Sequence, residues 1–212
     1  MIMENLFVLI LKGKADMKDK DADHSQRYEE LLDTAVELFE KKGYSSTTMR
    51  DIAKKMNLTQ GSLYYYIKKK EDILFQIHNI IIEMVLDSAS TIRESMTTKE
   101  KFNIIMTALM EVVIKKKSYV SVFLKEYKHI ESGVYWDVMA KRKKFEKIIQ
   151  GIINDEIKNG NFINIDPQIS AFALMGMFNW SLQWADVEGR MSLQEIKDIF
   201  LRIFFEGMVK RK

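Results

Sequence analysis

The sequence predicts an all-α protein, with a small N-terminal helix-turn-helix domain followed by a larger helical domain. Apolar residues recur at helical spacing along most of the 212-residue chain. Residues that can cap a helix stand where these periodic segments begin, and no segment shows the sustained alternation of apolar and polar residues that indicates a strand. We expect a flexible extension over residues 1–25, a first domain over 26–72 and a second over 73–212.

The first domain is predicted to hold three short helices. An apolar face over residues 31–39 indicates the first helix, which Gly43 can close. Thr47 or Thr48 can cap the second helix, which would end near residue 56. A turn at 57–58 separates it from a third helix over 59–66, which is very short.

Six longer helices are predicted in the second domain, over residues 71–95, 97–117, 119–130, 134–159, 166–185 and from 192 to the C-terminus. Two of them open on a capping box, Thr97 to Glu100 and Ser192 to Glu195. Another opens on an aspartate followed by Pro167, the only proline, at a position that a helix tolerates.

Composition excludes several classes of protein. The chain has no cysteine, so a disulfide framework and thiol chemistry are excluded. Its three histidines are too scattered to form a metal site, and no metal or cofactor is expected. The sequence contains no nucleophile elbow, glycine-rich phosphate loop or paired carboxylates, so we expect no catalytic residues and no enzyme activity.

The N-terminal extension carries an apolar run over residues 6–11, far shorter than the ~20 residues that span a bilayer. Glu4 and Lys12 flank the run, and this is not the pattern of a signal peptide. We therefore expect no membrane association and a cytoplasmic protein. Whether residues 1–16 belong to the native protein is left open, because Met17 is an alternative start.

Positive charge is concentrated in residues 41–70. This segment contains eight lysines or arginines and one acidic residue, Asp51, and so carries +7 in a chain whose net charge is +3. The remainder therefore carries −4. A short basic segment in an otherwise acidic protein indicates a surface that binds a polyanion such as DNA.

The spacing of residues 48–66 is that of a helix-turn-helix, whose second helix enters the major groove with its N-terminal residues facing the bases. Gln60 can pair with adenine through its amide, and Ser62 can bond to several base edges. Gly61 has no β-carbon, so DNA can approach the backbone closely. We therefore expect double-stranded DNA as a partner.

Residues 31–74, LLDTAVELFEKKGYSSTTMRDIAKKMNLTQGSLYYYIKKKEDIL, resemble the DNA-binding domain of TetR-family transcriptional regulators. The shared features are the corner from Phe39 to Gly43 and Tyr44, the T-M-x-x-I-A helix that starts at Thr48, and the G-x-L-Y-Y segment that starts at Gly61. The chain departs from the family where Tyr66-Ile67 replaces His-Phe. It departs again at Lys69, which replaces a serine or threonine cap.

The resemblance implies two groups of DNA contacts. Phosphates would be held by Thr48, Tyr64, Tyr65 and Lys70. Bases would be faced by Gln60, Gly61, Ser62 and Tyr66. The alternative for the tyrosines is packing at a half-buried surface, and the alternative for the neighbouring lysines is a solvated face.

The last two predicted helices are apolar around much of their circumference, which indicates burial on more than one side. TetR-like regulators pair these helices across a two-fold axis. The resemblance therefore implies a homodimer on a palindromic operator, with half-sites about 34–36 Å apart.

The resemblance also implies a cavity for a small apolar effector in the middle helices. Methionines and large aromatic residues are the candidates to line it, although ordinary core packing is the alternative for each of them. These candidates are Met106, Met110, Phe123, Tyr127, Tyr135, Trp136, Met139, Phe178 and Trp180.

The C-terminal strings GMFNWSLQW and EGRMSLQEI resemble TetR-type regulators of fatty-acid and sterol catabolism, which respond to acyl-CoA thioesters. The implied effector is a long-chain acyl-CoA, with its chain in the cavity and its phosphates near a basic side chain. Within the run Lys141 to Lys144 we select Arg142, because one helix cannot direct four consecutive side chains inward.

The predicted function is a ligand-responsive repressor that leaves its operator when the effector binds. One alternative is a repressor of multidrug or antibiotic efflux, which would meet cationic or aromatic ligands with buried acidic residues. Glu83 and Glu111 are the best candidates for that role. A second alternative is an architectural DNA-binding protein, which would respond to no effector.

Overall fold

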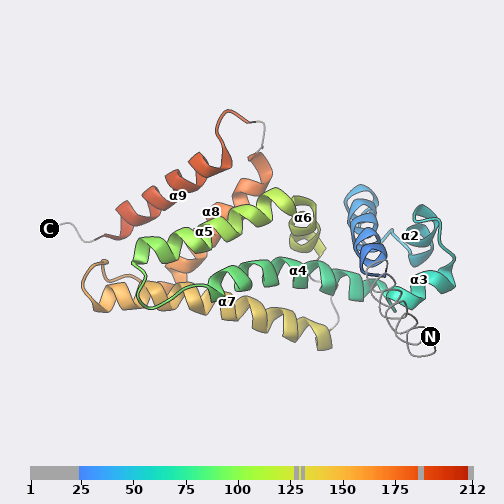
Figure 1. Cartoon of the computed structure of the whole chain (residues 1–212), viewed down its shortest axis with the longest axis horizontal. Helices are drawn as coiled ribbons and strands as arrows, with labels where there is room; N and C mark the ends of the chain where they lie inside the picture. Colours follow the sequence, from blue (N-terminus) through green and yellow to red (C-terminus); the bar gives the residue numbers. More distant parts are fainter. Residues whose placement is uncertain (1–23, 127–128, 130–131, 186–188, 210–212) are drawn as a thin grey trace, which may run out of the picture. The chain divides into compact units, whose positions relative to one another are not determined.

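The computed structural model describes residues 24–126, 129, 132–185 and 189–209. This part of the chain is built from α-helices, with one isolated β-bridge between Phe162 and Val209, so the predicted all-α class is confirmed (Figure 1). The chain forms two compact units, one up to Ile73 and one from Leu74.

The N-terminal unit contains a helix over residues 24–42, then α2 (Met49–Lys55), α3 (Gln60–Tyr66) and the first residues of α4 (Lys70–Ser90). Side chains from these helices form a small apolar core. Its buried members include Leu31, Leu32, Ala35, Val36, Phe39, Tyr44, Ile52, Ala53, Leu63 and Ile67.

The corner before α2 is fixed by hydrogen bonds. Gly43 has a φ of +82°, as predicted for the residue that closes a helix, and its N–H donates to the Phe39 carbonyl at 2.9 Å. The Thr47 hydroxyl is buried and donates to the Gly43 carbonyl at 2.9 Å. Thr48 is therefore the residue that caps α2, which decides between the two predicted threonines.

The turn between α2 and α3 is a Schellman motif. Asn57 adopts a φ of +56°, a left-handed conformation that asparagine tolerates better than most residues. The Leu58 N–H donates to the Ala53 carbonyl at 2.9 Å, and the Asn57 N–H donates to the Lys54 carbonyl at 3.2 Å. These bonds satisfy carbonyls at the end of α2 and set the direction in which α3 leaves.

The C-terminal unit contains the rest of α4 and five further helices. They are α5 (Thr98–Lys115), α6 (Lys117–Glu126), α7 (Ser132–Lys158), α8 (Pro167–Trp184) and α9 (Leu193–Met208). All six predicted segments are helical. The predicted caps are confirmed as well, because Thr97 and Ser192 each form a capping box and Asp166 accepts two N–H bonds at the start of α8.

Helix α4 ends at Ser90, five residues before the predicted end at 95. The reason is local competition for backbone groups. The Ser90 hydroxyl donates to the Asp87 carbonyl at 2.6 Å, and the Thr91 hydroxyl donates to the Ser88 carbonyl at 2.7 Å. Such side-chain bonds offer the backbone an alternative to continuing the helix.

Helix α5 lies at the centre of the C-terminal unit and packs against α6, α7, α8 and α9 (Figure 1). Phe102, Ile105 and Met106 of α5 are fully buried. Helix α9 is held to α5 by the Phe102–Phe204 ring pair at 5.4 Å and by the buried Lys197 ammonium, which donates to α5.

Within the described residues, α4 is also long and apolar enough to cross a membrane by length and composition alone. Core helices of water-soluble proteins satisfy the same criterion, and Ile82, Val85 and Ala89 of α4 are buried in the core of the C-terminal unit. This property is therefore weak evidence for a membrane span.

Candidate nucleic-acid interface and apolar cavity

The side chains of α3 divide into an inner and an outer set. Leu63 and Ile67 are buried, as predicted. Gln60, Gly61 and Ser62 are exposed at the start of the helix. The Gln60 amide has no hydrogen-bond partner among the described residues, so this end of α3 presents an unused amide to solvent.

The three consecutive tyrosines lie on the outer side of α3. Tyr65 is 73% exposed, Tyr64 is 42% exposed and Tyr66 is half-buried. The Tyr65 and Tyr66 rings meet edge to face at 5.4 Å, and His24 packs on both. The run is tolerated because only the flanking Leu63 and Ile67 enter the core.

Thr48 and Asp51 form reciprocal hydrogen bonds at the start of α2. The Thr48 hydroxyl donates to the Asp51 carboxylate at 2.7 Å and accepts from the Asp51 N–H at 3.1 Å. This hydroxyl, the Thr48 N–H and the nearby Lys42 lower the pKa of Asp51 to about 2. The predicted phosphate contact of Thr48 stays a prediction, and it requires the hydroxyl proton to turn away from Asp51.

Lys70 lies at the first residue of α4 and is partly buried. Its ammonium donates to the Tyr44 carbonyl at 2.7 Å and the Thr47 carbonyl at 2.8 Å, and it lies 4.1 Å from the centre of the Tyr44 ring. Lys70 therefore ties the start of α4 to the corner before α2. Two of its three protons are used in this way, which leaves one for the predicted phosphate contact.

The other basic residues of segment 41–70 differ in their partners. Lys42 pairs with Asp51 at 3.4 Å, and Lys55 pairs with Glu37. Arg50 and Lys54 are exposed and have no ion-pair partner within the described residues. These two residues therefore contribute positive charge on α2 that no described ion pair offsets.

Gly61 is not required by the protein's own packing. A β-carbon at this position would meet only the Thr59 hydroxyl, at an ordinary contact distance of 3.9 Å. A glycine inside a helix lowers stability relative to alanine. The packing of the described residues gives no reason for this glycine, and its predicted closeness to DNA stays a prediction.

A cavity of about 90 Å³ lies among five helices of the C-terminal unit. Most of its walls are branched aliphatic and aromatic side chains, and its polar members are His78, Arg142 and Asn179. The lining residues are His78, Ile81, Ile82, Val85, Leu109, Val112, Val113, Val120, Phe123, Leu124, Arg142, Phe145, Met175, Phe178 and Asn179. No aspartate or glutamate is among these described lining residues.

His78 is 2% exposed, and neither ring nitrogen has a hydrogen-bond partner within the described residues. Its ring packs against Phe123 with the ring centres 4.1 Å apart. Burial lowers the pKa of His78 to about 4, and the charges of Arg142 and Lys141 act in the same direction. The Val138 backbone acts in the opposite direction and raises this pKa, but it does not meet a ring nitrogen in hydrogen-bond geometry. The imidazole is therefore neutral near pH 7, with one donor and one acceptor nitrogen.

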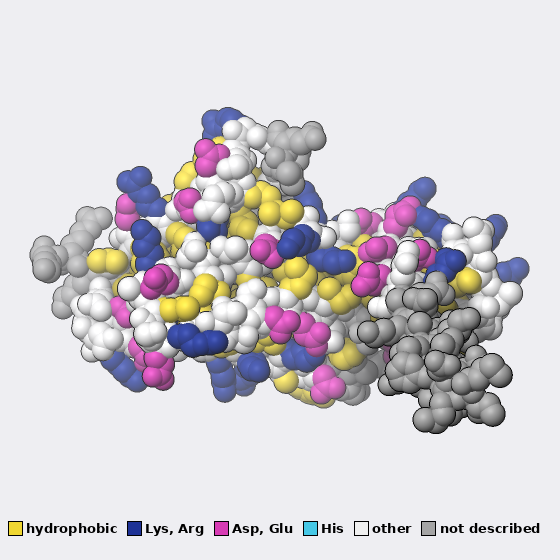
Figure 2. All heavy atoms as spheres, viewed as in Figure 1, with side chains coloured by type: hydrophobic (Ala, Val, Ile, Leu, Met, Phe, Trp, Pro, Cys, Tyr) yellow, Lys and Arg dark blue, Asp and Glu magenta, His cyan; other side chains and the backbone are white. Residues whose placement is uncertain are grey.

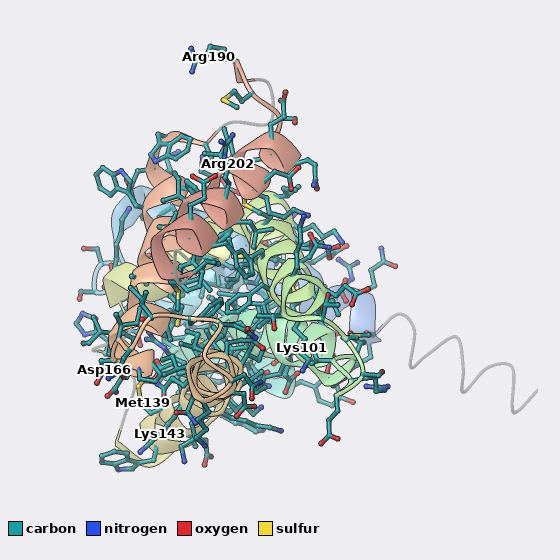
Figure 3. The ribbon with its side chains drawn as sticks, turned by 90° about the vertical axis from the view of Figure 1, so that its left-hand side faces the viewer. Lys101, Met139, Lys143, Asp166, Arg190 and Arg202 are labelled. Atoms are coloured by element: carbon teal, nitrogen blue, oxygen red, sulfur yellow. The ribbon has the colours of Figure 1, made fainter. Side chains whose placement is uncertain are left out.

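Of the four consecutive basic residues on α7, Arg142 is the one that lines the cavity. Its guanidinium lies 5.9 Å from the centre of the Phe123 ring. Lys141 instead pairs with Glu83 of α4 at 2.8 Å, and Lys143 and Lys144 are exposed. Figure 3 shows Lys143 at one edge of the unit, on the same helix as Met139.

The predicted cavity residues fall into three groups. Phe123, Phe178 and Arg142 line the cavity. Met106 and Met110 are buried in the general core and do not line it, and Met139 is half-buried outside it (Figure 3). Tyr127 and the side chain of Tyr135 lie outside the described part of the chain.

Trp136 and Trp180 require a correction, because each is 68% exposed and neither lines the cavity. Both stand on helix faces turned away from the core. Sequence reasoning also missed His78 and Asn179. Their sequence neighbourhood gives no sign of a site, and the alternation of buried positions along α4 would have identified His78 only as an inward-facing residue.

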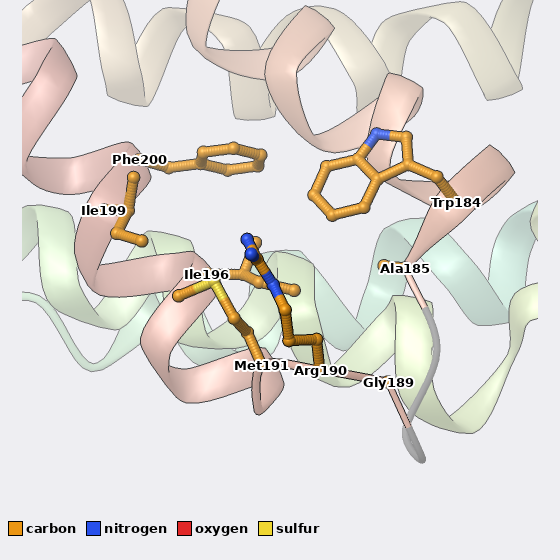
Figure 4. A pocket seen from close by; sticks show the side chains of 8 residues that line it. All are labelled: Trp184, Ala185, Gly189, Arg190, Met191, Ile196, Ile199 and Phe200. Atoms are coloured by element: carbon orange, nitrogen blue, oxygen red, sulfur yellow. The ribbon is translucent and has the colours of Figure 1, made fainter.

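Apolar side chains also reach the surface over α8 and α9 (Figure 2). The exposed members are Ile169, Phe172, Trp180 and Trp184 of α8 and Ile199 and Ile203 of α9. A hollow of about 410 Å³ lies at the end of this surface, where Figure 4 shows the Arg190 side chain directed toward the rings of Trp184 and Phe200. The described residues contain no cluster of histidine and acidic side chains that could hold a metal ion.

Two family models match the chain. The model described as "Bacterial regulatory proteins, tetR family" matches residues 31–77, and "Tetracyclin repressor-like, C-terminal domain" matches residues 95–208. The HTH-type transcriptional repressor KstR2 of Rhodococcus jostii (strain RHA1) is 26% identical over 204 residues, which cover 90% of this chain and 95% of that protein. The fatty acid metabolism regulator protein of Bacillus subtilis (strain 168) is 21% identical over 185 residues, covering 86% and 95%.

Solved structures show the same fold. The crystal structure of AibR in complex with isovaleryl coenzyme A and operator DNA has a TM-score of 0.73 and 27% identity, covering 84% of this chain and 98% of AibR. The ketosteroid transcriptional regulator KstR2 of Mycobacterium tuberculosis has a TM-score of 0.74 and 21% identity, covering 87% and 96%. The similarity to the second structure is evidence for the fold alone.

The lowered pKa of His78 predicts a specific pH dependence of stability. Above pH 6.5 the imidazole is neutral in both the folded and unfolded states and has no effect. As the pH falls from 6.5 toward about 4, the unfolded state binds a proton that the folded state does not, so the free energy of unfolding falls by up to about 3 kcal/mol. Urea denaturation of wild type and His78→Leu at pH 7 and pH 4.5 checks this. A difference between the two proteins that does not change with pH would contradict it.

Gly61→Ala is expected to separate stability from DNA binding. The added methyl group fits the folded protein and should raise the free energy of unfolding by about 0.5–1 kcal/mol. Binding to a duplex selected from a random library should weaken at least tenfold, because the methyl group would meet the DNA. Gly151→Ala is the matched control, since Gly151 is an exposed glycine within α7 with open space around it. Wild-type DNA affinity of Gly61→Ala would contradict the assignment.

Proposed function

The chain belongs to the TetR family of bacterial transcriptional regulators, and on this premise we propose that it is a repressor released from its operator by an acyl-CoA thioester. The observation that carries the proposal is the chemistry of the cavity. Its walls are apolar, its charged side chain is Arg142, and its described lining contains no carboxylate. Such a site suits an apolar group attached to an anionic carrier.

The relatives support the same effector class. AibR has been crystallised with isovaleryl coenzyme A and operator DNA, and a Bacillus subtilis relative is a fatty acid metabolism regulator protein. Arg142 is the residue we propose to meet the anionic part of the thioester. It lies at the cavity, whereas the neighbouring Lys141 is engaged by Glu83.

An efflux repressor for cationic compounds is the weaker interpretation. The two carboxylates that would receive a cation are both paired on the surface, Glu83 with Lys141 at 2.8 Å and Glu111 with Lys115 at 3.0 Å. Neither lines the cavity. A cation placed there would meet Arg142 without an opposing charge, which is electrostatically unfavourable.

For DNA we propose that the start of α3 contacts bases and that its flanks bind phosphates. Gln60, Gly61 and Ser62 are exposed, and the unused Gln60 amide suits a base edge. The remaining proposed contacts are Tyr66 to a base and Thr48, Tyr64, Tyr65 and Lys70 to phosphates. Such a protein acts where the chromosome is, so we propose a cytoplasmic location.

We propose that α8 and α9 form the surface of a homodimer. Their exposed apolar side chains would be covered by the same helices of a second copy. Gly176 and Gly207 lie on these helices, and a methyl group at either position would meet no other part of the chain within 4 Å, so a partner helix has room to approach. Two-fold symmetry would then place two α3 helices on a palindromic operator.

Release would follow from population shift. We assume that the effector binds more tightly to a conformer that fits DNA poorly. Effector binding can then lower operator affinity by at most the ratio of the effector's affinities for the two conformers. Helix α4 is the proposed connection, because one continuous helix carries Lys70 of the N-terminal unit and His78 of the cavity.

The test of the effector is operator release. Operator duplex selected in vitro is labelled and its binding followed by fluorescence anisotropy, with isovaleryl-CoA, palmitoyl-CoA, free CoA or the cationic dye crystal violet added. We expect at least one acyl-CoA to release the DNA at micromolar concentration, and free CoA and the dye to leave it bound. Release by the dye alone would favour an efflux repressor and overturn the proposal.

Gly176→Ala tests the dimer surface. The methyl group should raise helix stability by up to about 1 kcal/mol in the single chain, because nothing lies within 4 Å of it. It should weaken dimerisation about tenfold or more, measured by sedimentation equilibrium, because a partner helix would be displaced. Gly151→Ala should leave dimerisation unchanged. Equal dissociation constants for both variants and wild type would place the interface elsewhere.

A further inference from the structure

His78 is an unexplained polar residue in the effector cavity. It is 2% exposed, it lines the cavity, and both of its ring nitrogens lack a hydrogen-bond partner among the described residues. Native structures rarely leave a buried donor or acceptor unpaired, because the group loses its bonds to water and gains nothing in return. A histidine kept for packing alone is expected to have a partner. The Val138 backbone acts on the ring but meets neither nitrogen in hydrogen-bond geometry, so a bound molecule can supply the missing partner.

The surroundings of His78 define which group it can receive. Its ring is held against Phe123 at 4.1 Å, so the nitrogens at the ring edge remain for a ligand. Arg142 and Lys141 place positive charge around the ring. A neutral imidazole can donate one hydrogen bond, and positive surroundings favour an acceptor that carries partial negative charge. A carbonyl oxygen meets both requirements, whereas an amine or a plain hydrocarbon does not.

The size of the cavity limits the apolar part of the ligand. Its volume is about 90 Å³. A cavity of ~150 Å³ holds benzene, so this smaller space suits a group of about three to five carbons. A long acyl chain would need more space than this volume provides, so we favour a short acyl group over the long-chain effector that the resemblance implies.

We propose that His78 donates a hydrogen bond to the carbonyl oxygen of a short-chain acyl thioester, whose alkyl group of about three to five carbons fills the cavity and whose CoA portion leaves it beside Arg142. This assignment rests on the proposed function, because it names the acyl class and the atom that is recognised. It gives the buried imidazole a role that packing does not.

A matched pair of ligands tests the carbonyl directly. Butyryl-CoA carries the thioester carbonyl, and S-butyl-CoA has a methylene group in its place. By calorimetry, wild type should bind butyryl-CoA about tenfold more tightly than S-butyl-CoA. This ratio is expected because S-butyl-CoA cannot accept the hydrogen bond and leaves the buried imidazole unpaired. In His78→Leu the two ligands should bind equally, and His78→Gln, which retains a donor, should restore part of the preference.

The melting temperature of the ligand-free protein separates recognition from structure. His78→Leu should melt at or above the wild-type temperature, because the substitution removes an unpaired polar group from an apolar site. A marked loss of stability would show that His78 is a packing residue and overturn the assignment. Palmitoyl-CoA should bind at least tenfold more weakly than butyryl-CoA, and equal binding would overturn the short chain.

The outcomes distinguish this inference from the proposed function. If wild type binds acyl-CoAs but shows no preference for the carbonyl, or if His78→Leu keeps that preference, the role of His78 is wrong and the function stands. If wild type binds no acyl-CoA of any length, both fail, and the proposed effector class is wrong as well.

Discussion

The proposed regulation depends on the continuity of α4. Its first residue, Lys70, donates to the carbonyls of Tyr44 and Thr47 and so fixes the start of the helix to the corner before α2. Eight residues later, His78 reaches the cavity. At 1.5 Å per residue the two positions are about 12 Å apart along the axis. One continuous helix therefore carries both residues, which is why α4 is the proposed connection between effector binding and DNA binding.

Lys70 has a positional role that the sequence pattern does not reveal. A lysine that follows three tyrosines and two other lysines looks like one member of a basic run. In the structure the run is divided. Lys68 donates to the Tyr64 carbonyl of the preceding helix at 3.3 Å, whereas the Lys70 ammonium joins two elements and lies over the Tyr44 ring. Arg50 and Lys54 of α2 and Lys68 after α3 have no ion pairs within the described residues, so all three contribute positive charge to this unit.

The features that could be predicted from the sequence are those decided by neighbouring residues. Capping boxes, the left-handed Gly43 and the inward-facing Leu63 depend on three or four positions each, and all are present. The cavity depends on five helices at once. Its wall residues are mostly valine, leucine and isoleucine, which look like any core, and the rotation of a helix decides whether a tryptophan points in or out. Trp136 and Trp180 point out for this reason.

Several residues that oppose the stability of the isolated chain lie where a partner is proposed, although Gly151 of α7 is a helix glycine with open space where none is proposed. His78 leaves two buried nitrogens unpaired, Gly61 and Gly176 weaken helices that have room for a methyl group, and apolar side chains of α8 and α9 face solvent. A sequence selected for stability alone would remove such features by single substitutions. Their positions coincide with the three sites proposed above, for an effector at His78, for DNA at Gly61 and for a second subunit at Gly176. These residues lower the stability of the isolated chain at positions where binding of a partner is expected to restore it.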